Sequence, residues 1–114
     1  MQLDVTDRTD GISQVALVGK LDITGLHEVD LKFHSLTAAA KQPAIVDLTG
    51  LDYIASLGMG MLISCAKSLQ IAGETLVLVG AHGMVDTALR TAGIDQAIPM
   101  VDSVADAETV LRTA

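Results

Sequence analysis

Short apolar runs alternate along this chain with longer segments whose apolar residues recur every three or four positions, and this alternation limits the fold most. The runs at 44–48 and 75–79 are rich in β-branched and aliphatic residues and have few polar positions. Such runs are typical of central strands that are covered on both faces. Strands separated by helical segments predict an α/β fold with a mixed, mainly parallel sheet flanked by helices.

The amino-terminal part follows a different pattern, with a period of two. Leu3 and Val5, and later Val15 and Leu17, alternate with polar or small residues, and a turn-forming Asp-Gly pair lies between them at 10–11. This pattern predicts two strands joined by a hairpin.

A first helix is expected from Thr24, a residue suited to capping, to a point near Pro43. The remaining elements are expected as strand 44–48, a loop containing Gly50, helix 56–73, strand 75–79, helix 84–92, a weak strand 97–100 and helix 103–112. The predicted order is β-β-α-β-α-β-α-β-α, in one domain that spans residues 1–114.

The charge balance excludes several classes of partner. Fourteen acidic residues against seven basic ones give a formal net charge of −7, which disfavours binding to nucleic acid or to an anionic membrane surface. The uncharged stretch 53–66 is too short for a bilayer and contains two glycines, so we expect no membrane insertion. The first ten residues do not resemble a signal peptide, and Cys65 is the only cysteine. A cytoplasmic location is therefore expected.

Motifs for catalysis or for cofactor binding are weak. His27, His34 and His82 are scattered and more typical of surface residues than of metal ligands. Gly58 and Gly60 lack the rest of a dinucleotide or phosphate motif, and are interpreted as allowing close packing at the start of a helix. A single cysteine inside a helix is usually a small core residue. We expect no enzyme activity, no cofactor and no metal.

One segment of the sequence, by contrast, matches a known motif in detail. Residues 47–62, DLTGLDYIASLGMGML, resemble the signature of the STAS family, the sulfate-transporter and anti-sigma-antagonist domains. That signature has a strand ending in Asp-Leu, a short loop, an Asp-Ser-Ser or Asp-Ser-Thr triplet, and Gly-apolar-Gly opening a helix. Residues 19–22, GKLD, resemble the Gly-Glu-Leu-Asp element of the family. The predicted order of strands and helices agrees with this resemblance over nearly the whole chain.

The resemblance implies an anti-sigma-factor antagonist whose partner is an anti-sigma factor of the serine kinase type. It places the phospho-acceptor at Ser56, although an N-cap role for this serine is equally compatible with its position. The sequence departs from the signature at Ala55 and Leu57, where the family has Asp and then Ser or Thr. This departure keeps open a second function, a STAS subunit of a signalling assembly or transport system that is not phosphorylated.

Asp22 matches an acidic position on the family's functional surface, and its alternative role is that of a turn or helix-start residue. We expect Leu57 and Met61 to face outward, because they lie on a different stripe from the core positions of helix 56–73, which are Met59, Leu62, Ile63 and Ala66. The predicted partner-binding residues are therefore Asp22, Leu57, Gly58 and Met61. The sequence leaves open whether the chain forms a homodimer.

Overall fold

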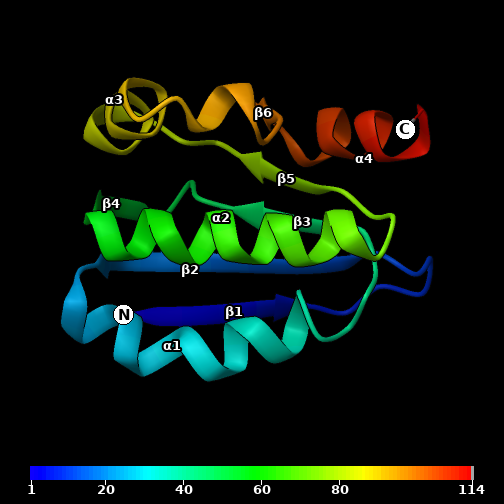
Figure 1. Ribbon diagram of the computed structural model, residues 1–114, viewed down its shortest axis with the longest axis horizontal. Helices are drawn as coiled ribbons and strands as arrows, with labels where there is room; N and C mark the ends of the chain where they lie inside the picture. Colours follow the sequence, from blue (N-terminus) through cyan, green and yellow to red (C-terminus); the bar gives the residue numbers. More distant parts are fainter. Residues whose placement is uncertain (114) are drawn as a thin grey trace.

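The computed structural model describes residues 1–113, and Figure 1 shows the arrangement of their helices and strands. The α/β class and the mixed, mainly parallel sheet flanked by helices are confirmed. In chain order, the elements are β1 (Gln2–Thr6), β2 (Ser13–Leu21), α1 (Ile23–Leu36), β3 (Ala44–Asp47), β4 (Leu51–Ile54), α2 (Ser56–Ile71), β5 (Leu76–Val79), α3 (Gly83–Thr91), the 3-10 helix η1 (Ile94–Gln96), β6 (Met100–Val101) and α4 (Val104–Thr113).

The sheet has the strand order β1-β2-β3-β5-β6, and β4 pairs with β2 outside this path. The strands β1 and β2 are antiparallel, as expected for a hairpin. The central strands are parallel, with Val15 of β2 beside Val46 of β3, and Ile45 of β3 beside Val77 of β5. The predicted parallel strands around Val15, Ile45 and Val77 are therefore confirmed.

The apolar runs of β3 and β5 are uniform because helices cover both faces of these strands. Successive side chains of a strand point to opposite faces. Val46 and Leu78 join the larger core cluster, to which α1, α2 and α3 contribute, whereas Ile45 and Val77 join the smaller cluster with α4. In Figure 1, α1 and α2 lie next to each other in front of the sheet.

The strand β4 is absent from the predicted order, which placed this segment in a loop. Gly50 lies in the turn that precedes it and packs closely on β2, where an added Cβ would lie only 3.0 Å from Cγ2 of Val18. Leu51 and Ile54 at the two ends of β4 are buried, and the two residues between them are exposed. Four residues with this burial pattern do not have the period of two by which a strand is identified from sequence.

The predicted strand at 97–100 is also corrected. Gly93, with a φ of 76°, stops α3 in the left-handed region that favours glycine, and η1 follows it. The strand β6 begins only at Met100, which pairs with Leu78. Ile98 is 2% exposed and thus fills the core from a turn. Apolar content alone could not distinguish a buried turn from a strand.

The first helix ends at Leu36, earlier than the expected end near Pro43. The C-cap residue Thr37 is buried, and both its backbone N–H and its hydroxyl donate to the carbonyl of Phe33, at 3.1 and 2.6 Å. These two bonds satisfy a carbonyl that would otherwise have no partner at the helix end. The bounds of α2, α3 and α4 lie within two residues of those predicted.

Candidate functional site

The carboxyl ends of β2 and β4 lie next to each other at one edge of the sheet, on the left in Figure 1. Leu21 pairs with Ile54, and the backbone N–H of Ala55 donates to the carbonyl of Leu21 at 3.0 Å. The helices α1 and α2 begin directly after these strands. The fold therefore brings Asp22 and Ser56, which are far apart in the sequence, to the same edge.

Ser56 is the first residue of α2, as the sequence predicted, and it is exposed. The residue at the N-cap is Ala55, which has an extended backbone (φ −92°, ψ 167°) and offers no side-chain hydrogen bond to the helix. The interpretation of Ser56 as the N-cap is therefore wrong by one position. Since capping does not use its hydroxyl, the side chain is left available for other contacts.

The first turn of α2 has backbone donors without partners inside the helix. The first intrahelical bond runs from the N–H of Met59 to the carbonyl of Ala55, at 3.0 Å. The N–H groups of residues 56–58 precede that bond, and they carry the positive end of the helix dipole. An anionic group attached to Ser56 would lie beside these donors.

Gly58 and Gly60 differ in their surroundings although they are two residues apart. Gly58 is buried, and an added Cβ would lie 2.7 Å from Cγ and 3.1 Å from the carbonyl oxygen of Leu21. Close packing at the helix start is thus confirmed for Gly58, and its burial corrects the assignment of this residue to the partner surface. Gly60 is exposed, and an added Cβ would meet nothing within 4 Å. The close-packing interpretation of Gly60 is therefore wrong.

Asp22 is the N-cap of α1. Its side chain accepts a hydrogen bond from the backbone N–H of Gly25 at 2.8 Å, which confirms the helix-start role. Thr24, which was expected to cap the helix, lies inside its first turn. The half-buried carboxylate of Asp22 lies at the same edge as Ser56. A direct contact of Asp22 with a partner remains a prediction.

Four large apolar side chains are exposed at the start of α1, α2 and α3 and at the end of β4. Ile23 is 57% exposed, Tyr53 40%, Leu57 56% and Met84 45%. The outward orientation of Leu57 is confirmed. Sequence reasoning did not identify the other three as surface residues. For Ile23 and Met84 the signal was available, because both precede the buried stripe of their helices.

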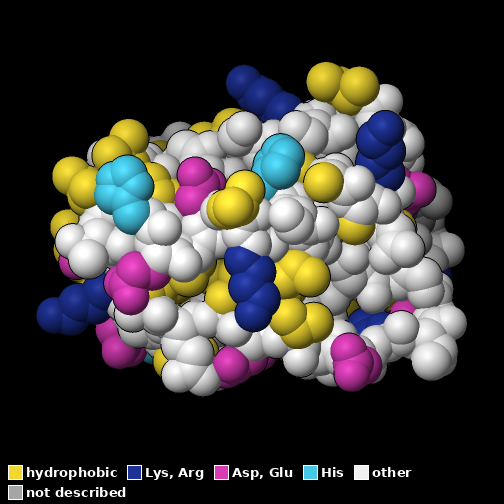
Figure 2. Space-filling model, turned by 90° about the horizontal axis from the view of Figure 1, so that it is seen from below, with side chains coloured by type: hydrophobic (Ala, Val, Ile, Leu, Met, Phe, Trp, Pro, Cys, Tyr) yellow, Lys and Arg dark blue, Asp and Glu magenta, His cyan; other side chains and the backbone are white. Residues whose placement is uncertain are grey.

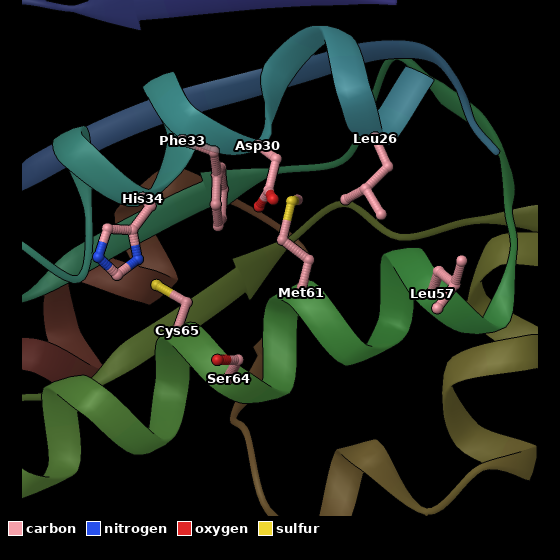
Figure 3. A pocket seen from close by; sticks show the side chains of 8 residues that line it. All are labelled: Leu26, Asp30, Phe33, His34, Leu57, Met61, Ser64 and Cys65. Atoms are coloured by element: carbon pink, nitrogen blue, oxygen red, sulfur yellow. The ribbon is translucent and has the colours of Figure 1, made fainter. Parts of the chain in front are cut away.

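Met61 was predicted to face outward, and this prediction is wrong, because its side chain is only 9% exposed. It lies in a groove of about 270 Å³ between α1 and α2. Figure 3 shows Leu26 and Phe33 of α1 opposite Leu57 and Met61 of α2 across this groove. Met61 therefore points toward α1, and the groove begins directly beside Ser56.

Cys65 is a buried core residue, as predicted, and it closes the floor of the same groove. Its thiol donates to the hydroxyl of Thr37 at 2.9 Å. Burial raises the pKa of the Cys65 thiol, and the hydrogen bond with Thr37 offsets this only in part. The thiolate that a nucleophilic role would need is thus disfavoured.

The three histidines are exposed, as predicted. His82 lies before α3, and its Nε2 donates to the carbonyl of Thr49 at 2.8 Å. Thr49 in turn donates from its hydroxyl to Asp47 at 2.6 Å. These bonds join the loop after β3 to the loop before α3. Among residues 1–113, no three His, Cys, Asp or Glu side chains come together in a group that could hold a metal ion.

Comparisons with known proteins agree with this architecture. The family model of the STAS domain matches residues 5–107. BtrV of Bordetella bronchiseptica, provisionally assigned as an anti-sigma factor antagonist, is 27% identical over 109 residues, which cover 95% of this chain and 93% of BtrV.

Solved structures share the fold at low identity. An anti-sigma factor antagonist from Mycobacterium paratuberculosis has a TM-score of 0.80 at 21% identity, with 97% of this chain and 95% of that chain covered. The antagonist SpoIIAA in its unphosphorylated form has a TM-score of 0.78 at 16% identity, with 99% and 98% covered. The phosphorylated form of Bacillus SpoIIAA has a TM-score of 0.68 at 16% identity, with 99% and 100% covered.

None of the helices formed by residues 1–113 combines the length and the apolar character that crossing a membrane requires.

Proposed function

This chain belongs to the STAS domain family, and we propose that it is a cytoplasmic anti-sigma-factor antagonist that phosphorylation of Ser56 switches off. In the unmodified form it binds an anti-sigma factor of the serine kinase type and thereby frees a sigma factor. The chain itself catalyses no reaction, and the phosphate comes from ATP bound by the partner. The BtrV relative and the antagonists of known structure support this assignment.

One observation carries the proposal: Ser56 is exposed at the first position of α2, and the helix does not use its hydroxyl for capping. A kinase needs a hydroxyl that can enter its active site without unfolding its substrate. Ser56 meets this need, and the exposed side chain of Leu57 lies beside it. A partner that binds Leu57 would thus cover Ser56 as well.

Phosphorylation changes this surface in two ways. It adds about −1.5 to −2 charges, which a partner fitted to an apolar surface would have to desolvate. The phosphate would also receive hydrogen bonds from the free N–H groups at the start of α2, which favours the modified state. We expect affinity to fall by roughly 5- to 150-fold, corresponding to a coupling of about 1–3 kcal/mol.

The test uses each serine-kinase-type anti-sigma factor encoded in the source genome, purified separately. The chain is incubated with each one and ATP, and its intact mass is measured. Titration calorimetry then compares the unmodified, phosphorylated and Ser56→Ala forms. We expect Ser56→Ala to bind like the unmodified form and to remain bound when ATP is added. Equal affinity of the unmodified and phosphorylated forms would exclude a switch at Ser56.

The residues next to Ser56 support a second candidate. Ala55 replaces the acidic residue of the STAS signature, and it also leaves α2 without a side-chain cap. In this alternative the chain is a STAS subunit of a signalling assembly or transport system and is never phosphorylated. A chain whose mass does not change with any of the kinases, but which co-purifies in a stable assembly, would favour this second function.

A further inference from the structure

The groove between α1 and α2 contains an acidic group that the fold does not use. The carboxylate of Asp30 lines it and points toward Met61 across the groove in Figure 3. Asp30 is exposed, and none of the ion pairs or side-chain hydrogen bonds within residues 1–113 includes it. By contrast, Asp22 caps a helix and Asp86 pairs with Arg90.

Around this carboxylate the groove combines apolar side chains with the polar side chains of His34 and Ser64. Phe33 and Met61 form a buried floor, at 1% and 9% exposure, and Leu57 forms the exposed wall nearest to Ser56. An apolar floor with one unpaired charge at its margin fits a ligand that is apolar in its centre and positively charged on one side. A partner that covers this groove would displace water from the charge pair, which would then be stronger than on an open surface.

The shape of the groove favours a segment of protein over a small molecule. His34 also lines a second hollow, of about 600 Å³, toward the carboxyl ends of the two helices, where Lys41 and Ile71 contribute to its wall. The two hollows share His34, and together their lining residues extend along most of α1 and α2. A peptide segment or helix that lies along these two helices could bury side chains in both hollows.

The charge of the chain disfavours a second copy as the occupant. With a formal net charge of −7, two copies repel each other unless specific contacts offset the repulsion. In Figure 2, the side of the molecule that carries α1 and β1 shows acidic, basic and histidine side chains interspersed among hydrophobic ones. The charge complementarity is therefore local, and a partner segment needs a basic residue opposite Asp30 itself.

We propose that the groove between α1 and α2 binds a segment of the anti-sigma factor, and that a lysine or arginine of this segment pairs with Asp30. Apolar side chains of the same segment lie on Met61 and Phe33. This inference rests on the proposed function and extends the interface from Ser56, through Leu57, along α1. The partner therefore contacts two helices, and Asp30 selects a basic residue.

The experiment compares Asp30→Asn with Asp7→Asn, a matched control. Both substitutions remove one negative charge from an exposed side chain, but Asp7 lies in the turn between β1 and β2, outside the groove. The purified kinases named above are titrated with the wild type and with each variant at low and at high salt. Thermal unfolding verifies that both variants fold.

We expect Asp30→Asn to weaken binding about tenfold at low salt and less at high salt, and Asp7→Asn to stay within about threefold of wild type. Equal losses for both variants would overturn the inference and leave the proposed function standing. A wild-type chain that binds none of the kinases would overturn the proposed function, and this inference with it. If sedimentation shows a dimer that Asp30→Asn dissociates, the occupant is a second copy and the inference is wrong.

Discussion

Replacing Gly58 by alanine tests how closely α2 approaches β2. The new Cβ would lie 2.7 and 2.8 Å from two side-chain atoms of Leu21, a residue with 0% exposure that has little space to move. Such overpacking costs about 2–3 kcal/mol, in the upper half of the usual range, whereas alanine gains about 1 kcal/mol over glycine in helix propensity. We therefore expect a net loss of about 1–2 kcal/mol in the free energy of unfolding.

Gly60→Ala is the matched control, because it makes the same chemical change in the same helix. An added Cβ at position 60 meets nothing within 4 Å. Only the propensity gain remains, so this variant should be more stable than the wild type by about 0.5–1 kcal/mol. For a chain of this size, the midpoint of thermal unfolding should fall by about 4–8 °C for Gly58→Ala and rise by about 2–4 °C for Gly60→Ala.

Urea unfolding followed by circular dichroism measures both changes, and equal m-values would show that the unfolded states are comparable. In a Leu21→Ala background, where the clashing atoms are absent, Gly58→Ala should become much less destabilising. Shifts of the same sign for the two single variants in the wild-type background would refute the reasoning. An unchanged effect of Gly58→Ala in the Leu21→Ala background would assign its cost to a contact other than the one with the Leu21 side chain.

Three further predictions follow from individual contacts. Asp22→Ala should lower the free energy of unfolding by about 1 kcal/mol in urea, and Asp22→Asn by less, because asparagine still caps; equal losses would contradict the cap. Leu57→Glu should change the free energy of unfolding by no more than about 0.5 kcal/mol, whereas Met61→Glu, which buries a carboxylate, should lower it by more than about 3 kcal/mol. A Met61→Glu variant as stable as the wild type would contradict the burial of that residue. The hydrogen bonds from Arg8 lower the pKa of Asp10 from 3.8 to about 2, so the stabilisation by this pair is complete above the unfolded pKa and is lost as pH falls through about 2. The Arg8→Ala variant lacks the Arg8–Asp10 pair, so its acid unfolding, followed by circular dichroism, should differ from that of the wild type at low pH. An acid transition identical to that of the wild type would contradict a stabilising role of this pair.

The central strands could be predicted from the sequence because their environment is the same on both faces. Ile45 and Val46 point to opposite sides of the sheet, and both are fully buried. Every position of such a strand is apolar, so no knowledge of the neighbouring elements is needed. The position of Ser56 was equally accessible, since it depends on a local boundary between an extended segment and a helix.

The orientation of Met61 was decided by tertiary structure. The sequence stripe through Leu62 and Ala66 marks the face of α2 that packs on the sheet, and it places Met61 outside that face. However, α2 also packs against α1, and this second contact buries Met61 and Cys65. A helix with two neighbours buries a wider arc than one stripe indicates, and the sequence pattern does not record which helix lies beside it.

The sequence by itself determined the class of the fold, the parallel core strands and the helix start at Ser56, because these depend on the period and burial of contiguous residues. Only the tertiary structure added β4, brought Asp22 to the edge that carries Ser56, and left the carboxylate of Asp30 in a groove without a partner within residues 1–113. These features arise where segments distant in the chain meet. Such meetings depend on the packing of whole elements, which local periodicity does not specify.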